Sequence, residues 1–322
     1  MKSIIKNLRN TQWFFLLLVV IVLSIITGTI NPKYFYVRNL INILEQISVL
    51  GLVASGATVL MISGNFDISV GANIGLASCV MAMLMKNDMA TVLAVGTGLI
   101  VAVACCFFVG LNSILFKAPS FIISLACIGI FKGLALALTE GTIQTIYGKF
   151  ETIGALRIFN VIPLLFVISL LGYITVHLIL SYTRLGRRVY AIGSNRQAAY
   201  RSGIAVNKNT LIFFTLNGVL VGTAAMLLLS RVGAVQPSTG SGIELKAIGA
   251  VVIGGAPMTG GKGKIIGTFF GVLLMGVLSN VLNMLRVNPY FQEITFGALI
   301  IVSLAVTTLS QKDYRTFIAE EP

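Results

Sequence analysis

The sequence predicts an all-α integral membrane protein with about ten transmembrane helices, one or more of them half-length or broken. The chain has 322 residues, of which 57% are apolar and only 10% are charged, and its mean hydropathy is +0.96. Soluble domains carry about 25% charged residues, so this chain has too few charged residues to cover a water-facing surface. Only helices and closed barrels satisfy the backbone in lipid, and long continuous apolar runs favour helices. The composition excludes a soluble enzyme, a disordered chain and a secreted disulfide-bonded domain.

The first predicted span covers residues 11–30 and follows the basic residues Lys2, Lys6 and Arg9. A run of about 20 apolar residues is long enough to cross the hydrocarbon core of a bilayer. No small-residue cleavage site closes the run, so we expect a retained helix rather than a signal peptide. The basic flank predicts an N-terminus in the cytoplasm.

Nine further spans follow, and the eighth of the ten is too short to cross a membrane alone. Their predicted ranges are 46–63, 67–85, 90–116, 119–139, 161–182, 209–230, 243–256, 264–284 and 292–310. With the N-terminus inside, the even-numbered spans end in the cytoplasm, where loops are expected to be basic. The loop 183–208 after the sixth span contains five Arg, one Lys and no acidic residue, which agrees with this parity. We therefore interpret the net charge of +13 as loop bias rather than nucleic-acid binding, and expect both termini to be cytoplasmic.

A weak internal similarity relates two halves of what we treat as one transmembrane domain, 1–322. Gly96 precedes Asn112 by the same spacing as Gly267 precedes Asn283, each within a helix rich in small residues. The repeat-like halves would be about 46–139 and 209–310. An odd number of crossings separates them, which predicts an inverted repeat of the kind found in transporters.

Two acidic residues, Asp67 and Glu244, each lead a glycine-interrupted apolar segment, and we expect them at equivalent points of the two halves. Ionisable groups at membrane depth are costly and tend to face a cavity or one another. The candidate pathway or gating residues are Asp67, Ser69, Asn112, Glu244 and Asn283. For the asparagines, a hydrogen bond between helices is the alternative interpretation.

Residues 251–264 look like a phosphate-binding loop but lack two of its determinants. The pattern G-x-x-x-x-G-K-[ST] requires Gly where this chain has Ala256, and Ser or Thr where it has Gly263. We expect these glycines to form a tight turn between two spans.

The chain also contains a single His and no convergent set of acid, base and nucleophile. We expect no catalytic residue, no cofactor and no metal site in this chain.

The loop 183–208 is the segment of the sequence that most strongly indicates a function. It is expected to break at Gly193 and to form a short helix from Asn195 to about Ser202, capped by Asn195 and ended by Gly203. One interpretation is a basic loop that only sets topology. The other is a surface helix that docks a cytoplasmic partner, since a purely topological loop needs no small-residue face such as Ala198, Ala199 and Gly203.

Four ordered blocks, within a match that runs from about residue 35 to 310, resemble the permease subunit of bacterial ABC importers for ribose, similar simple sugars and autoinducers. The blocks are SGNFDISVG (63–71), LGRRVYAIGSNRQAAYRSGI (185–204), GIELKAIGAVVIGG (242–255) and TGGKGKIIGT (259–268). The departures from the family pattern are Asn65, Phe66, Ile68, Ser194, Lys246 and Gly249. The sharpest is Lys246, where the family usually has Asp.

The resemblance implies a bacterial inner-membrane importer that is built from several chains with separate roles. Two permease subunits, identical or closely related, would form the pathway for a ribose-like sugar. Cytoplasmic ATPases would bind ATP and magnesium, and an extracytoplasmic binding protein would deliver the sugar. The resemblance places the coupling helix at 193–204, and its expected coupling residues are Gly193, Asn195, Ala198, Ala199, Ser202, Gly203 and Ile204.

Two other classes remain open from the residues alone. An ion-coupled secondary transporter that works without partners would also have ten spans, an inverted repeat and buried carboxyl groups. A membrane-embedded enzyme is the third class. The loop 183–208 distinguishes the first two, because a self-sufficient carrier needs no docking helix.

Overall fold

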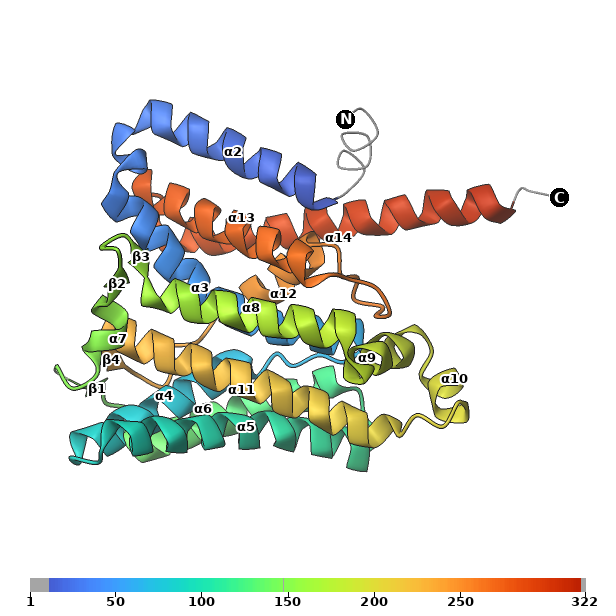
Figure 1. Cartoon of the computed structure of the whole chain (residues 1–322), viewed down its shortest axis with the longest axis horizontal. Coiled ribbons are helices and arrows are strands. Elements are labelled where there is room, and N and C mark those ends of the chain that lie inside the picture. The colour runs from blue at the N-terminus through green and yellow to red at the C-terminus, as the bar shows by residue number, and fades with distance from the viewer. Residues whose placement is uncertain (1–11, 147, 320–322) are drawn as a thin grey trace.

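The long helices run side by side along the longest axis of the molecule, as Figure 1 shows. The computed structural model describes residues 12–146 and 148–319. Lys2, Lys6 and Arg9, which carried the predicted orientation of the N-terminus, lie outside the described residues. The bundle has two ends: the α10 end, which carries α9 and α10, and the β-strand end, which carries four short strands.

Seven helices in the described part of the chain are long and apolar enough to cross a membrane. They are α2 (Gln12–Ile30), α3 (Val37–Ile62), α5 (Thr91–Leu115), α6 (Ser120–Thr139), α8 (Leu164–Tyr182), α11 (Val206–Val232) and α13 (Ile265–Met284). Three more helices, α4 (Val70–Lys86), α12 (Ile243–Ile253) and α14 (Pro289–Ala319), account for the remaining predicted spans. The predicted all-α membrane architecture is confirmed, including a short eighth span, α12, of 11 residues.

The helix α3 lies at the centre and is the most deeply buried of the seven spans, packing against α8, α11, α12 and α13. By contrast α2 lies on the outside, against α13, and keeps most of its surface exposed. Its exposed side chains include Phe15 and Ile25, as expected for a helix that faces lipid. The core around α3 is rich in small residues, which let helix backbones approach closely.

Two crossings are broken, because a non-helical stretch precedes a short helix. Residues 63–69, the first unwound stretch, lead into α4, and residues 236–242, the second, lead into α12. Unpaired backbone groups are not tolerated in lipid. In the first stretch, the backbone N–H groups of Phe66 and Ile68 donate to the hydroxyl groups of Ser120 and Ser124 on α6, at 2.8 and 3.2 Å.

The second unwound stretch packs directly on α4. A Cβ atom added to Gly71 would collide with the carbonyl oxygen of Gly240, and one added to Gly75 would collide with that of Pro237. Gly71 and Gly75 are four residues apart and therefore share one face of α4. The two broken crossings thus meet in a close backbone contact that only glycine allows at these two positions.

At the α10 end, the loop 183–208 folds into two helices, α9 (Arg184–Ser194) and α10 (Arg196–Arg201). The expected break at Gly193 is wrong: Gly193 is helical, and the chain turns at Asn195, whose backbone is extended (φ −158°, ψ 104°). The physical reason is that Gly193 serves close packing rather than a turn. An added Cβ there would collide with the carbonyl oxygen of Ile62.

The β-strand end is closed by short connecting elements. These are η1 (Pro32–Phe35), α7 (Glu151–Ala155) and four two-residue strands, β1 (Gln144–Thr145), β2 (Arg157–Ile158), β3 (Ile162–Pro163) and β4 (Ala234–Val235). Antiparallel pairs form between β1 and β4 and between β2 and β3. The turn joining β2 to β3 places Phe159 and Asn160 at positive φ, as tight hairpins require.

Candidate functional site

The helix α10 is fixed at both ends by its own side chains and backbone. Asn195 Oδ1 accepts a hydrogen bond from the Ala198 N–H at 2.9 Å, so Asn195 is the N-cap that its sequence position predicts. The Ser202 hydroxyl donates to the Ala198 carbonyl at 2.9 Å. After the helix, Gly203 takes positive φ (80°), and the Ile204 N–H donates to the Ala199 carbonyl at 3.1 Å.

The outward face of α10 is basic and aromatic. Ala199 is buried, while Ala198 and Gly203 are exposed, so the expected small-residue face is divided between the interior and the surface. The Tyr200 side chain is 73% exposed. A cavity of about 620 Å³ opens beside α10 and is lined by Arg196, Gln197, Tyr200, Arg201, Ala205, Val206, Asn207 and Lys208. None of these lining residues is acidic, so the surface would attract an acidic partner.

Three segments converge at what we term the α9 junction: residues 62–64, 190–194 and 260–263. The Ile62 carbonyl accepts a hydrogen bond from the Gly261 N–H at 2.8 Å, and Gly193 packs against the same carbonyl. The Tyr190 hydroxyl donates to the Gly263 carbonyl at 2.9 Å, and burial raises the pKa of Tyr190, which keeps it neutral. The glycines of the sequence that resembles a phosphate-binding loop, Gly260, Gly261 and Gly263, therefore allow close packing at this junction.

A polar cluster lies at the centre of the bundle around Asp67, which is 5% exposed. Ser69 donates both its backbone N–H and its hydroxyl to Asp67 Oδ1, at 2.9 and 2.5 Å. Asn217 Nδ2, on α11, lies 3.4 Å from Asp67 Oδ2 and 3.5 Å from the sulfur of Cys106. Asn73 Nδ2, on α4, donates to the Ala102 carbonyl and to the same sulfur. Asp67 and Ser69, two of the candidate pathway residues, are therefore in direct contact.

Sequence reasoning missed Asn73 and Asn217, although each is an uncharged amide within an apolar helix. Such residues usually bond across helices in a membrane protein. The signal that could have found them is the amide itself, which interrupts the apolar runs of α4 and α11. The four cysteines, Cys79, Cys105, Cys106 and Cys127, are free and buried.

Glu244 does not occupy the position equivalent to Asp67. Asp67 lies three residues before the first residue of α4, whereas Glu244 is the second residue of α12. Its Oε1 accepts from the Gly242 N–H at 3.1 Å, and its Oε2 packs on Gly71 with no hydrogen-bond partner among the described residues. The expected equivalence is wrong because Asp67 lies within the first unwound stretch, whereas Glu244 lies in the first turn of α12. Glu244 still lies where the two broken crossings meet.

The remaining pathway candidates, Asn112 and Asn283, lie at opposite ends of the bundle. Asn112 Nδ2 donates to the Phe108 carbonyl of its own helix at 2.7 Å. Asn283 is exposed at the β-strand end, where its Oδ1 accepts from Gln292 at 3.0 Å. The structure does not bring either side chain to Asp67.

Lys246 pairs with Glu293 of α14 at 3.3 Å, and its ammonium lies 4.5 Å from the ring centre of Phe296.

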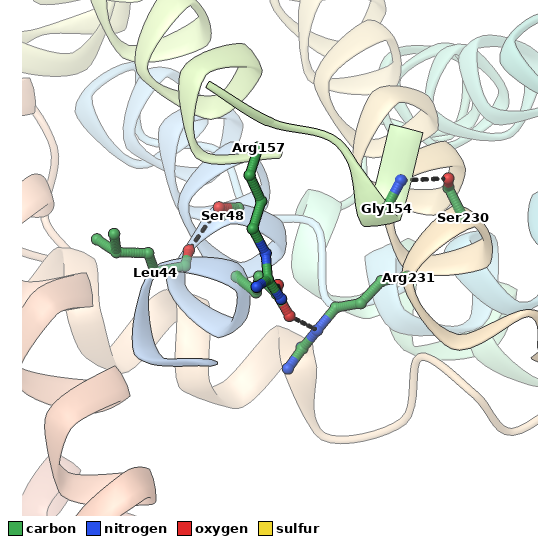
Figure 2. Close-up of polar contacts among 7 residues, drawn as sticks. Leu44, Ser48, Gly154, Arg157, Ser230 and Arg231 are labelled. Carbon is green, nitrogen blue, oxygen red and sulfur yellow. Dashed lines mark hydrogen bonds and ion pairs between the residues drawn. The ribbon is translucent and has the colours of Figure 1, made fainter. Parts of the chain in front are cut away.

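An ion-pair cluster joins the elements of the β-strand end. The carboxylate of Glu45, on α3, lies 3.3 Å from Arg231 of α11 and 3.9 Å from Arg157 of β2. Figure 2 shows the two arginine side chains converging on one carboxylate. In the same view, the Gly154 N–H donates to the Ser230 hydroxyl at 2.9 Å. These contacts hold α7 and the hairpin of β2 and β3 against α3 and α11.

Beside this cluster is a cavity of about 450 Å³ that sequence reasoning did not anticipate, the outer amide cavity. It is lined by Asn39, Asn42, Gln46, Arg231, Asn280, Asn283 and Met284. On α3 the amides recur at spacings of three and four residues, which places Asn39, Asn42 and Gln46 on one helix face. That spacing is the signal by which they could have been found.

Comparison with known proteins relates most of this chain to transport permeases. Residues 39–304 match the family model described as branched-chain amino acid transport system / permease component. The chain is 36% identical to the ribose import permease protein RbsC of Bacillus subtilis, with 88% of each chain covered. It is 33% identical to RbsC of Escherichia coli K12, covering 92% of this chain and 93% of that one.

A second group of relatives is named for a different cargo. The autoinducer 2 import system permease protein LsrC of Escherichia coli O9:H4 is 30% identical, over 93% of this chain and 88% of its own. No solved structure matches the chain.

Proposed function

Because this chain belongs to the family of branched-chain amino acid transport system / permease components, we propose that it forms the membrane pathway of an ATP-driven importer for a ribose-like monosaccharide. The observation that carries the proposal is the similarity, along about nine-tenths of the chain, to permeases named for ribose and autoinducer 2 import. The energy would come from separate ATPase subunits, and an extracytoplasmic binding protein would deliver the sugar.

The α10 end would face the cytoplasm. Residues 183–208, which include the loop between α8 and α11, carry six basic and no acidic residues, which is typical of the cytoplasmic side of a bacterial inner membrane. The helix α10 would sit in a groove of the ATPase, with Arg196 and Arg201 facing acidic groups there. Its caps at Asn195 and Gly203 would make it stiff enough to carry a push.

The α9 junction offers a route by which that push would reach the pathway. A force on α10 would move α9. Gly193 of α9 packs against the carbonyl of Ile62, the last residue of α3. The next residues form the first unwound stretch, which carries Asp67. The Gly261 N–H on the same carbonyl connects the push to the segment between α12 and α13. Both broken crossings would then change position together.

The two halves, about 46–139 and 209–310, would be an inverted pair. The matching order of elements supports this: each half has a long helix, an unwound stretch, a short helix and two further helices. In such transporters the substrate path lies between the halves, at the broken segments. A second permease subunit, a copy or a close relative, would complete the pathway.

The experiment is reconstitution of this chain with its ATPase and binding protein in liposomes. We expect uptake of a labelled monosaccharide that requires both ATP and the binding protein. Ribose, xylose, arabinose, galactose and glucose would be tested in parallel. Uptake by this chain alone, driven by a proton or sodium gradient, would overturn the proposal in favour of a secondary transporter.

A further inference from the structure

The outer amide cavity has the chemistry of a binding site rather than of a structural contact. Five of its seven lining residues are amides, one is Arg231 and one is Met284. Amide groups present donors and acceptors side by side without charge. At about 450 Å³, the cavity is within the size range of small-molecule sites in proteins, and it would hold a monosaccharide together with water.

The floor of the cavity is rigid. Asn39 Nδ2 donates to Asn280 Oδ1 at 3.0 Å, and Asn280 Nδ2 returns a hydrogen bond to Asn39 Oδ1 at 2.8 Å. This reciprocal pair joins α3 to α13 and gives each amide oxygen a donor. A site built on two helices locked in this way holds its geometry better than one built on loops.

The walls of the cavity carry unused hydrogen-bonding groups. The side chains of Asn42 and Gln46 make no hydrogen bond within residues 12–146 and 148–319. Arg231 reaches Glu45 through Nε, which leaves its two terminal nitrogens without a hydrogen-bond partner in the same described part of the chain. Donors and acceptors are therefore available on two sides of one cavity.

We propose that the outer amide cavity binds a neutral polyhydroxylated molecule, such as a monosaccharide, through the side chains of Asn42, Gln46 and Arg231. The inference rests on the proposed function and deepens it, because it locates a station for the cargo at the β-strand end. Sugar hydroxyl groups both donate and accept hydrogen bonds, as the amides of Asn42 and Gln46 do.

A branched-chain amino acid fits this cavity poorly, although the family description names that class. Its ammonium group favours a carboxylate, and none of the residues lining the cavity is acidic. The carboxylate of Glu45, which contacts Arg231 of the cavity, is also paired with Arg157. Its apolar side chain needs an apolar pocket, and Met284 is the one apolar residue among those lining the cavity. A neutral polyol needs neither.

The test is protection of an engineered thiol in the assembled transporter, with its ATPase and binding protein. Met284→Cys places a thiol in the cavity and leaves every polar lining residue in place. The four native cysteines are buried, so their reaction with a membrane-impermeant maleimide is slow. Asn87→Cys, exposed at the same end but outside the cavity, is the matched control.

The probe is whichever of ribose, xylose, arabinose, galactose and glucose the wild-type importer carries. We expect it to slow the labelling of Met284→Cys and to leave Asn87→Cys unchanged. Adding Asn42→Leu and Gln46→Leu should raise the sugar concentration needed for protection by about tenfold, since each neutral hydrogen bond is worth a factor of about 2 to 12.

The outcomes separate the two proposals. If the wild-type importer carries none of the five sugars, the proposed function fails, and this inference fails with it. If a sugar is carried but does not protect Met284→Cys, the inference alone is overturned. Complete resistance of Met284→Cys to the maleimide in the assembled transporter would show that another chain covers the cavity, which would also overturn it.

Discussion

Gly193 of α9 packs directly on the main-chain carbonyl of Ile62, so that no side chain separates the two helices at this point. The same carbonyl accepts the Gly261 N–H at 2.8 Å. Three segments distant in sequence therefore share one backbone contact, at the place where the first broken crossing begins.

We expect Gly193→Ala to impair both stability and transport. The added methyl group would collide with Ile62 and Gly261, and forcing extra atoms into a packed site costs about 1 to 3 kcal/mol. Thermal unfolding of the purified protein and ATP-driven uptake would measure the two effects. Gly96→Ala is the matched control, because Gly96 is also helical and has no atom within 4 Å of an added Cβ. Equal behaviour of the two variants would remove the α9 junction from the coupling route.

Charge reversal on α10 should weaken attachment of the ATPase without unfolding the permease. In the variant Arg196→Glu Arg201→Glu, both substituted side chains are exposed, so the change acts on the surface. Co-purification of the ATPase should fall, and in the wild type it should fall as ionic strength rises, because exposed charges are screened by salt. Arg38→Glu, exposed at the β-strand end, is the control. Undiminished ATPase recovery would show that α10 does not dock through its charges.

Gly203→Asp should uncouple transport with expression retained, since Gly203 is exposed at positive φ and only glycine adopts this conformation freely. Ala199→Arg is a less clean test, because Ala199 is buried and the larger side chain would disturb α10 itself. Sugar uptake and ATP hydrolysis measured together would separate the two effects. Normal uptake by Gly203→Asp would assign the end of α10 to topology alone.

Asp67→Ala should destabilise the protein more than Asp67→Asn. Alanine would leave the buried N–H and hydroxyl of Ser69 without an acceptor, and each unsatisfied buried group costs about 1 to 3 kcal/mol. Asparagine keeps an acceptor oxygen. The measurement is the thermal midpoint in detergent, combined with uptake. We expect Asp67→Asn to slow the transport cycle, and unchanged uptake by a stable Asp67→Asn protein would make Asp67 purely structural.

Asn39 and Asn280 should behave as a coupled pair. Since side-chain hydrogen bonds between transmembrane helices average about 0.6 kcal/mol and reach about 1.7, the reciprocal pair should lie toward the upper end. A double-mutant cycle with Asn39→Leu and Asn280→Leu would report this coupling as a change in unfolding free energy. Additive effects would show that the two amides do not stabilise each other.

The helices could be predicted because each depends on local composition. Runs of about 20 apolar residues identify a transmembrane helix, and the N-cap at Asn195 with glycine at 203 identifies α10. The cluster around Asp67 was only half predicted. Asp67 and Ser69 stand close together in sequence, while Asn217 reaches them from 150 residues away.

The sequence by itself determined the membrane class, the ten helical segments, the capped helix α10 and the family. Those features follow from hydropathy, capping and motif order, which are properties of neighbouring residues. Tertiary structure alone decided that Gly193 is helical, that Ala199 faces inward and that Glu244 is not equivalent to Asp67. It also decided that amides from α3 and α13 form one cavity with Arg231. These features depend on which helix faces lie against each other, and packing between distant segments sets that.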